Sequence, residues 1–402
     1  IKFLLDVFRE GINKPAIIWN EKPTPYGWMV QHVNAWLNEL SGRDIPPGAV
    51  IAFEADYSPD AVALFLALIE HSCILVPLAE GAEHQKAGRI VAAQAEYHIA
   101  ADSRDRISFE RLPHQATHPF YATLCRRGHP GLVLFSPGPD GTERAALHDL
   151  VGLLEAYKGR RPARRAIPLL PHDHLGGFHT LLHVLSNHGT LVVVPERGPD
   201  PVLAAVERHK VELLPASPAF LEQMLESGAC QRHDLRTLQV VTVGGAPLAE
   251  ETIRRFGESL PGVALEQVYG LAEVGVLGAT GKDPASPWIK VGGEGVETRV
   301  VDGRLQIRSR SAMLGYLNAP SPFSEDGWFV TGDEVLVDGE YFRILGRRSE
   351  LINVGGEKVY PAEVESVLQE QANVAEVTVY GEKNPITGNI VCAMVRLKEV
   401  ED

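Results

Sequence analysis

Strand-like and helical patterns alternate along much of this chain, and the alternation restricts its fold more than any other feature. Residues 58–71 have helical spacing of apolar side chains and begin with Ser58 and Pro59, which suit a helix start. The apolar run at residues 73–78 is typical of a buried strand. Residues 238–256 repeat the pattern as strand, glycine turn and amphipathic helix. The sequence therefore predicts an α/β fold with a large N-terminal domain of mixed and parallel sheets covered by helices.

Charge and cysteine usage exclude several classes of protein. The 402 residues carry a formal net charge of −14, which argues against a basic nucleic-acid-binding surface. The most apolar run, residues 61–78, is interrupted by Glu70 and His71, so we expect no membrane-spanning helix. The cysteines lie far apart without C-x-x-C spacing, as expected of reduced cytoplasmic thiols, and give no support for a metal site: Cys73, Cys125, Cys230 and Cys392.

Residues 327–339 predict a turn that carries a carboxylate, followed by a hairpin. Thr331, Gly332 and Asp333 suit a tight turn on which the carboxylate can accept hydrogen bonds from a diol. Asp338 and Gly339 are a strong signal for a two-residue hairpin.

Residues 346–365 add cations and glycines to this segment. Arg347 and Arg348 are followed by Gly355 and Gly356, and then by Pro361 at the start of a predicted helix. An arginine fork beside a glycine-rich turn suits an anionic ligand that carries a sugar. A hairpin with a surface helix is the alternative that the pattern alone leaves open.

A second segment, residues 132–149, has the composition of a phosphate-binding loop. A buried strand leads into a loop rich in glycine and hydroxyl groups, where backbone N–H groups can approach a phosphate closely. It is not a Walker loop, and an ordinary turn remains the alternative. The candidate residues are Ser136, Gly138, Gly141, Thr142 and Arg144.

Residues 238–275 form a third candidate segment. A glycine turn follows the first strand, and Tyr269 and Gly270 end the next one. Open α/β sheets bind ligands at such strand ends, and an aromatic ring next to a glycine offers a flat face to a purine. The carboxylate of Glu273 can hold Mg²⁺ through oxygen.

Histidines follow the apolar run near residue 168. His172 and His174 flank Asp173, which cannot readily point the same way, so a metal site would want another ligand nearby. A loop histidine without a role is the alternative for each.

The order of these motifs resembles the adenylate-forming superfamily, which includes acyl- and aryl-CoA ligases, nonribosomal adenylation domains and luciferases. The matching motifs include GW-x-x-TGD at residues 327–333, GGAPL at 244–248 and GGEKVYPAEVE at 355–365. The resemblance extends from about residue 15 to the end of the chain and points to the acyl-CoA ligase branch.

The resemblance implies a role for each candidate residue. Asp333 would hold the ribose hydroxyls of ATP, Arg347 would contact the nucleotide, and His174 would gate the acyl pocket. Glu273, Arg144 and His174 would be catalytic, and Glu273 would be the Mg²⁺ ligand. The remaining nucleotide and CoA contacts would be Ser136, Gly138, Gly141, Thr142, Gly245, Ala246, Pro247, Tyr269, Gly270, Gly355 and Gly356.

The implied reaction joins a fatty or aryl carboxylic acid to ATP, giving acyl-AMP, and then transfers the acyl group to CoA. Departures from the family pattern weaken the expected phosphate contacts: Pro139 and Asp140 replace small hydroxyl residues, Arg144 replaces lysine and Ala272 replaces threonine. Two alternatives stay open. One is transfer to the phosphopantetheine of an acyl carrier protein, and the other is a catalytically degraded homologue that binds acyl groups or nucleotides.

The resemblance also implies a division into domains. We expect an N-terminal AMP-binding domain at residues 1–346 and the start of a mobile C-terminal α+β domain at residues 347–402, with a hinge near Ser349. Family members continue with a helix and a Gly-Lys segment, so we expect the sequence either to be truncated or to lack that lysine.

Overall fold

The structure is a computed structural model, and it describes most of the chain. The described residues are 1–79, 83–138, 142–246, 248–282, 286–293, 295–347, 351–354, 357–369, 371, 373–384 and 388–397. They form two compact units. Unit 1 comprises Ile1–Val243, Gly270–Val276 and Ser309–Pro322, and unit 2 comprises Gly244–Tyr269, Leu277–Arg308 and Phe323–Asp402.

The first sheet of unit 1 has the strand order β18-β8-β7-β4-β3-β5-β6. Its central strands β7, β4, β3 and β5 are parallel, and β6, β8 and β18 join them antiparallel. The strands are β3 (Val50–Glu54), β4 (Ile74–Leu78), β5 (Tyr97–Ala101), β6 (Ile107–Arg111), β7 (Gly131–Pro137), β8 (Glu143–Asp149) and β18 (Gly315–Tyr316).

A second run of strands in unit 1 has the order β12-β11-β9-β10-β1-β2, parallel except for β2. The strands are β1 (Pro15–Trp19), β2 (Lys22–Pro25), β9 (Arg165–Ala166), β10 (Thr190–Val192), β11 (Leu213–Ala216) and β12 (Val240–Gly244). Parallel strands buried on both faces are the arrangement that the alternating sequence predicts.

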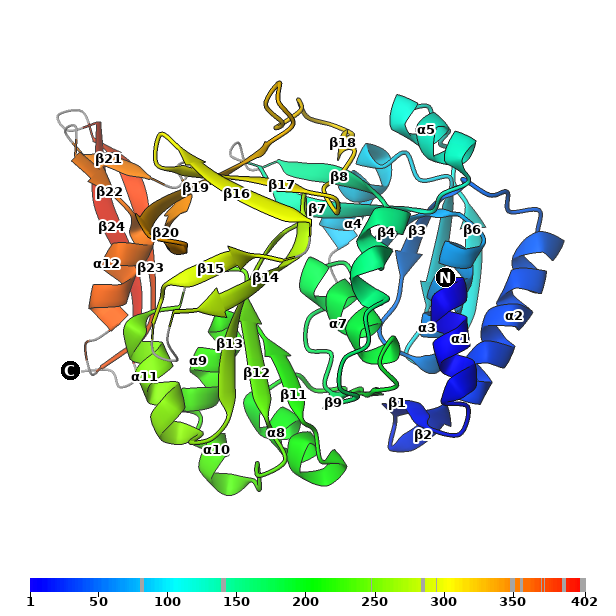
Figure 1. The fold of residues 1–402 in the computed structure, drawn as a ribbon, viewed down its shortest axis with the longest axis horizontal. Helices are drawn as coiled ribbons and strands as arrows, with labels where there is room; N and C mark the ends of the chain where they lie inside the picture. The colour runs from blue at the N-terminus through cyan, green and yellow to red at the C-terminus, as the bar shows by residue number, and fades with distance from the viewer. Residues whose placement is uncertain are drawn as a thin grey trace. The chain divides into compact units, whose positions relative to one another are not determined.

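The helices of unit 1 pack around these sheets. They are α1 (Lys2–Glu10), α2 (Tyr26–Gly42), α3 (Pro59–Glu70), α4 (Glu83–Ala92), α5 (Pro119–Arg127), α6 (Leu150–Leu154), the 3₁₀ turn η1 (Glu155–Tyr157), α7 (Leu175–Leu185), α8 (Pro199–His209), α9 (Pro218–Glu226) and α10 (Ala229–Arg232). At the N-terminal end of the chain, α1 and α2 pack together, and α2 packs against α3 (Figure 1).

Helix α3 and strand β4 confirm the first sequence prediction. Pro59 occupies the first turn of α3, and the backbone N–H groups of Asp60 and Ala61 donate to the Asp105 carboxylate at 2.9 and 3.2 Å. This carboxylate satisfies N–H groups that a helix start leaves without partners. Residues 61–69 of α3 and all of β4 are buried, so this helix–strand pair is core scaffold.

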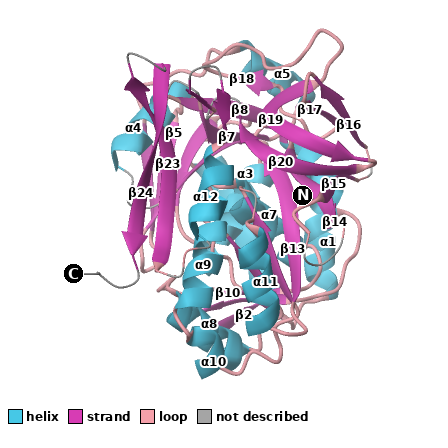
Figure 2. Cartoon of the chain, turned by 90° about the vertical axis from the view of Figure 1, so that its left-hand side faces the viewer, coloured by secondary structure: helices cyan, strands magenta, loops and turns pink. Residues whose placement is uncertain are grey.

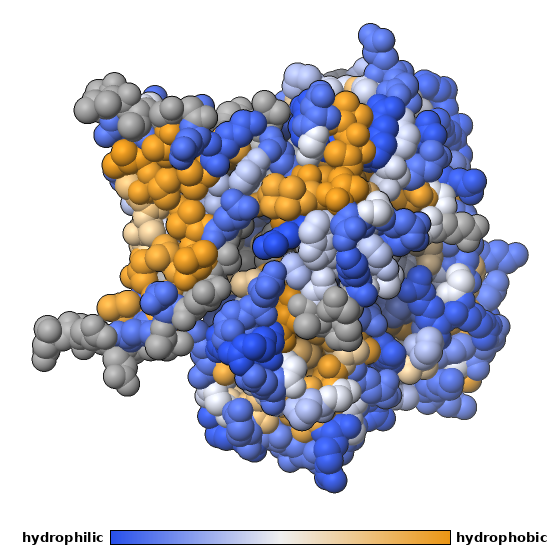
Figure 3. Space-filling view, turned by 60° about the vertical axis from the view of Figure 1, so that its left-hand side comes forward, coloured by the Kyte–Doolittle hydropathy of each residue, from blue (hydrophilic) through white to orange (hydrophobic). Residues whose placement is uncertain are grey.

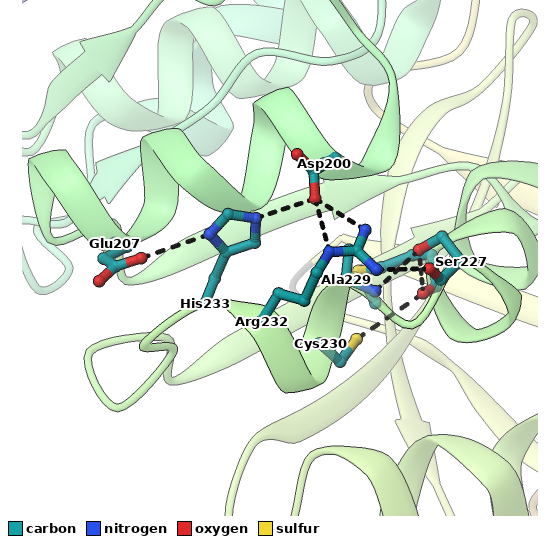
Figure 4. A network of polar contacts seen from close by, with 8 residues as sticks. Asp200, Glu207, Ser227, Ala229, Cys230, Arg232 and His233 are labelled. Carbon is teal, nitrogen blue, oxygen red and sulfur yellow. Dashed lines mark hydrogen bonds and ion pairs between the residues drawn. The ribbon is translucent and has the colours of Figure 1, made fainter.

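Ion pairs tie α8 to α10 at the surface of unit 1 (Figure 4). The Asp200 carboxylate accepts hydrogen bonds from Arg232 at 2.7 Å and from His233 at 3.1 Å. The other ring nitrogen of His233 lies 3.3 Å from Glu207. No group of three or more histidine, cysteine, aspartate or glutamate side chains among the described residues could hold a metal ion, so this network joins the two helices without forming a metal site.

Unit 2 contains two sheets. The strand order of the first is β16-β17-β19-β20-β15-β14-β13, and that of the second is β22-β21-β24-β23. Its elements are α11 (Glu250–Ser259), β13 (Ala264–Leu271), β14 (Gly275–Gly281), β15 (Ile289–Gly292), β16 (Val296–Val301), β17 (Arg304–Ser309), β19 (Phe329–Asp338), β20 (Tyr341–Arg347), β21 (Ile352–Val354), β22 (Glu357–Val359), α12 (Pro361–Gln369), β23 (Val374–Asn384) and β24 (Gly388–Leu397). Figure 2 shows β23 and β24 as a long pair, with α12 packed against β23.

The hairpin prediction is confirmed, whereas the predicted tight turn at Thr331–Asp333 is wrong. Strands β19 and β20 meet at Asp338 and Tyr341, with Gly339 at φ 61° between them. The TGD motif lies inside β19, which continues from Phe329 to Asp338. Gly332 takes φ 80° there, so the backbone is locally irregular although the strand does not end.

Candidate active site

A buried carboxylate is the centre of the first cluster, which lies in unit 2. Asp333 is 5% exposed and projects from β19, opposite Arg347 in the β19–β20 ladder. The Tyr269 hydroxyl donates to Oδ2 of Asp333 at 2.5 Å, and Nε of Arg347 lies 3.5 Å from Oδ1. One carboxylate thus joins two residues that the sequence predicted as nucleotide contacts.

Local backbone chemistry orients this carboxylate. The Thr331 hydroxyl donates to the Leu305 carbonyl at 2.8 Å and accepts from the Asp333 backbone N–H at 3.0 Å. Burial, and then the neighbouring Asp333 carboxylate, raise the pKa of Tyr269 well above its usual value, so its hydroxyl remains a donor. The cluster therefore presents a fixed, acceptor-rich carboxylate of the kind that binds a sugar diol.

A second buried carboxylate, Glu273, is the centre of a cluster in unit 1. It is 6% exposed, and its Oε1 accepts hydrogen bonds from the Ser136 hydroxyl and the Tyr316 hydroxyl, both at 2.7 Å. The guanidinium carbon of Arg144 lies 5.4 Å from the centre of the Tyr316 ring. Ser136 and Arg144 face each other in the β7–β8 ladder, so the two ends of the predicted phosphate loop lie beside this cluster, Ser136 on the Glu273 carboxylate and Arg144 over the Tyr316 ring.

His148 fixes the backbone that carries Glu273. It is fully buried, with Nε2 2.5 Å from the Ala272 carbonyl oxygen and Nδ1 3.2 Å from that of Ser311. Burial lowers the pKa of His148 despite these carbonyls and Glu273, so the neutral imidazole is favoured. The Met313 N–H donates to the Glu273 carbonyl at 2.8 Å and holds the same segment from the other side.

Tyr316 and His148 are contacts that the sequence analysis missed. The Gly315–Tyr316 pair belongs to none of the candidate segments, and His148 lies in an otherwise apolar run. A lone histidine in such a run is a weak signal, because pattern alone does not show which backbone carbonyls its ring meets.

The predicted phosphate loop is described only at its ends. The Gly138 N–H donates to the Thr142 carbonyl at 2.8 Å, which closes the loop between β7 and β8. Pro139, Asp140 and Gly141 lie outside the described residues. The phosphate-contact role of the loop therefore stays a prediction.

The nucleotide contacts predicted near residues 245 and 270 are also described in part. Gly245 follows β12 with φ 101°, where a residue with a Cβ would be strained, and Ala246 is exposed. Pro247 lies outside the described residues. A Cβ on Gly270 would come within 3.1 Å of the Gly275 carbonyl oxygen, so a larger residue directly after Tyr269 would require the neighbouring backbone to shift by a few tenths of an ångström.

The two histidines near residue 172 have different surroundings. His174 caps α7, its Nδ1 accepting from the Gly176 N–H at 3.1 Å, while Asp173 pairs with Arg89 at 2.9 Å. His172 is buried, and its Nε2 has no hydrogen-bond partner among the residues that the structure describes. The three side chains of residues 172–174 therefore form no common site, and the gating role of His174 stays a prediction.

The hinge and thiol-binding predictions fall on residues that are not described. Ser349, Gly355 and Gly356 lie outside the described residues. Their predicted roles, and the boundary at residue 346, stay predictions.

Comparisons with known proteins identify relatives of this chain. The AMP-binding enzyme family matches residues 141–317, and the AMP-binding enzyme C-terminal domain matches residues 363–402. The indoleacetate–CoA ligase of Aromatoleum aromaticum is 28% identical over an alignment 437 residues long, which covers 95% of this chain and 85% of that ligase. The 4-coumarate–CoA ligase 5 of Oryza sativa subsp. japonica is 34% identical over 255 residues, 56% of this chain and 47% of that ligase.

A solved structure shares the fold. A variant of the amide bond synthetase McbA from Marinactinospora thermotolerans is 26% identical and superposes with a TM-score of 0.81, covering 99% of this chain and 90% of that structure. Within the described part of the chain, no helix is long and apolar enough to cross a membrane.

Proposed function

Because this chain belongs to the AMP-binding enzyme family, in its acid–CoA ligase branch, we propose that it activates an aromatic carboxylic acid with ATP and transfers the acyl group to CoA. In the first step a carboxylate oxygen attacks the α-phosphorus, and the bond to pyrophosphate breaks. In the second step the CoA thiol loses its proton, its sulfur bonds to the acyl carbon, and AMP leaves. The buried Asp333 carboxylate with its Tyr269 and Arg347 partners is the observation that carries this proposal.

The residues of each cluster have distinct roles in this proposal. Asp333 accepts hydrogen bonds from the ribose hydroxyls, and Arg347 places a positive charge beside the nucleotide. Arg144 supplies positive charge to the phosphates, where charge neutralisation assists phosphoryl transfer.

We assign Glu273 as the protein ligand for Mg²⁺. Two hydroxyls hold its Oε1, and no hydrogen bond from another described residue engages its Oε2. One carboxylate suffices because Mg²⁺ commonly takes its other ligands from substrate phosphates and water. The metal would neutralise phosphate charge as the pyrophosphate leaves.

An aromatic acid is proposed rather than a fatty acid because of the relatives. The named ligases act on indoleacetate and 4-coumarate, both aromatic acids. The cytoplasmic location stays a prediction that rests on four free thiols.

Pyrophosphate release across a panel of aryl and fatty acids tests the first step. Aryl acids should release pyrophosphate with ATP and Mg²⁺, and fatty acids should release less. Products formed with CoA, with a phosphopantetheinylated carrier protein and with an amine then identify the acceptor. Thioester formation with CoA supports the proposal, whereas product formation only with the carrier protein or the amine contradicts its second step.

Restoring the family's hydroxyl groups separates a slow enzyme from a degraded one. Threonine at positions 139, 140 and 272 together should speed pyrophosphate release and leave AMP affinity nearly unchanged, because AMP lacks the phosphates that these hydroxyls would meet. AMP binding without any pyrophosphate release, before and after the restoration, would favour the degraded homologue.

A further inference from the structure

A strongly basic segment shares no residue with either carboxylate cluster. Residues 158–165 contain five cationic side chains in eight positions, although the whole chain has a net charge of −14. The segment joins η1 to β9 and leads into the amino end of that strand, which is parallel to β10. His174 follows the opposite, carboxyl end of β9.

Three of the five cations have evident partners. Lys158 pairs with Glu155, and Arg160 lies 2.5 Å from Glu10. Arg165 donates to the His209 carbonyl at 2.7 Å.

The guanidinium groups of Arg161 and Arg164 are different. No hydrogen bond or ion pair joins either group to another described residue, and the Nε of Arg164 is buried without a partner. Leaving a buried donor of a charged group unpaired costs free energy, so this arrangement favours an external acceptor.

A cavity of about 180 Å³ opens beside this segment. It is lined by Arg160, Arg161, Ala163, Ser186, Asn187 and His188. Drug-sized ligands need roughly 300–1,000 Å³, so the cavity suits a small group.

Most other polar atoms around the cavity are already engaged. The Asn187 side chain accepts from the backbone N–H of Arg161 at 2.5 Å and donates to the His183 carbonyl at 2.8 Å. The Nε2 of His188 lies 2.5 Å from the Val7 carbonyl oxygen. The Val184 carbonyl, at the end of α7, accepts from the Gly189 N–H. Guanidinium donors are therefore the main hydrogen-bonding groups left for a ligand.

The electrostatics of His183 agree with uncompensated positive charge. Burial, and then Arg161 and Arg164, lower the pKa of His183 to about 4. A carboxylate close to Arg161 and Arg164 would raise the pKa of His183 and so oppose their effect. Glu10 pairs with Arg160 instead.

We propose that the cavity lined by residues 160, 161, 163 and 186–188, at the amino ends of β9 and β10, binds the phosphate group of a small molecule, and that Arg164, which follows the lining residue Ala163, serves as a further donor. Guanidinium groups bind phosphate through paired N–H donors and keep their charge at all physiological pH values. The site shares no residue with the carboxylate clusters and does not depend on the proposed ligase activity.

Calorimetric titration of the whole chain with inorganic phosphate, at constant ionic strength, tests this site. Arg161→Gln and Arg164→Gln should each weaken phosphate binding at least fivefold. Arg236→Gln is the matched control, because Arg236 is an exposed arginine of the same unit that pairs with Asp234. A second titration with glycerol phosphate distinguishes free phosphate from a phosphomonoester as the preferred form.

The nucleotide cluster supplies the second control. Asp333→Asn should weaken AMP binding and leave phosphate binding at this site unchanged. If phosphate binding is absent, or equally strong in Arg161→Gln, Arg164→Gln and Arg236→Gln, the proposal is wrong. Phosphate binding that AMP displaces and that Asp333→Asn abolishes would place the ion in the nucleotide site and overturn the proposal as well. Should Arg164→Gln misfold, Arg164→Lys keeps the charge and should lose only part of the affinity.

Discussion

At the scale of single residues, Asp333 makes the sharpest test of the nucleotide site. Replacing it with alanine removes the acceptor for the ribose hydroxyls and leaves the Tyr269 hydroxyl without its partner. AMP affinity should fall by about 1.5–3 kcal/mol, the usual range for a hydrogen bond to a charged group. Calorimetry with AMP measures this. Asp326→Ala, a surface carboxylate of the same unit that pairs with Arg299, is the control. Unchanged AMP binding in Asp333→Ala would place the ribose elsewhere.

Tyr316 tests the other carboxylate cluster. Tyr316→Phe keeps the ring beside Arg144 and removes one of the two hydroxyls that donate to Glu273. We expect pyrophosphate release to slow by roughly fivefold to tenfold, equivalent to about 1 kcal/mol, and AMP affinity to stay the same. Weakened AMP binding with normal pyrophosphate release would assign Tyr316 to the nucleotide cluster instead.

These residues also show what the sequence could predict about the site. Asp333, Tyr269 and Glu273 lie in motifs that follow one another in order, so the sequence alone predicted them as site residues. The structure buries all three with polar partners. Tyr316 lies 43 positions from Glu273, and His148 lies 124 positions from Ala272. Contacts over such separations depend on how strands pair, which periodicity within one segment does not encode.

At the scale of elements, helix α7 carries a pair of buried histidines that should make stability depend on pH. His179 and His183 stack at 5.6 Å, and Nδ1 of His179 lies 2.9 Å from the Tyr157 hydroxyl. Burial, and then His183 and Arg161, lower the pKa of His179 to about 3. The folded state therefore favours the neutral imidazole, and the unfolded state takes up the proton first.

The sign of the effect follows from this lowered pKa. The contribution of His179 to stability is complete above pH 6.5 and is lost as the pH falls from about 6.5 towards 3. Between pH 7.5 and pH 5 the loss should be roughly 2 kcal/mol. Denaturant unfolding of the wild type and of His179→Gln at both pH values measures it. The variant should lose less stability than the wild type on acidification, and equal losses would contradict the prediction.

Sequence predictions of individual elements succeeded where the signal was local and failed where tertiary pairing decided the structure. The α3–β4 pair and the β19–β20 hairpin are confirmed, because apolar spacing, helix starts and an Asp-Gly turn are local signals. The TGD motif was misplaced on a turn because glycine and aspartate favour turns in general. Pairing with β17 and β20 keeps the segment in a strand, and that pairing is a tertiary effect.

At the scale of the whole molecule, the family and the α/β architecture predicted from the sequence agree with the comparisons. The domain boundary predicted at residue 346 stays a prediction. The C-terminal sheet exposes apolar side chains along β23 and β24, including Met394 at 68% and Leu397 at 42% exposure (Figure 3). Apolar faces of this kind often mark surfaces that contact other chain segments or proteins, so this sheet is a natural candidate for a part that docks and moves.

Ser349 is where we expect that movement to originate. Proline at this position would fix φ near −65° and remove a backbone N–H, which should restrict rotation of residues 350–402 relative to residues 1–346. Ser349→Pro should therefore impair one half-reaction much more than the other, because adenylation and thioester formation would need different domain orientations. Single-turnover assays of pyrophosphate release and of acyl-CoA formation separate the two steps, with Ser349→Ala as the control that keeps φ free. Equal rates for Ser349→Pro and Ser349→Ala in both steps would show that the hinge lies at another residue.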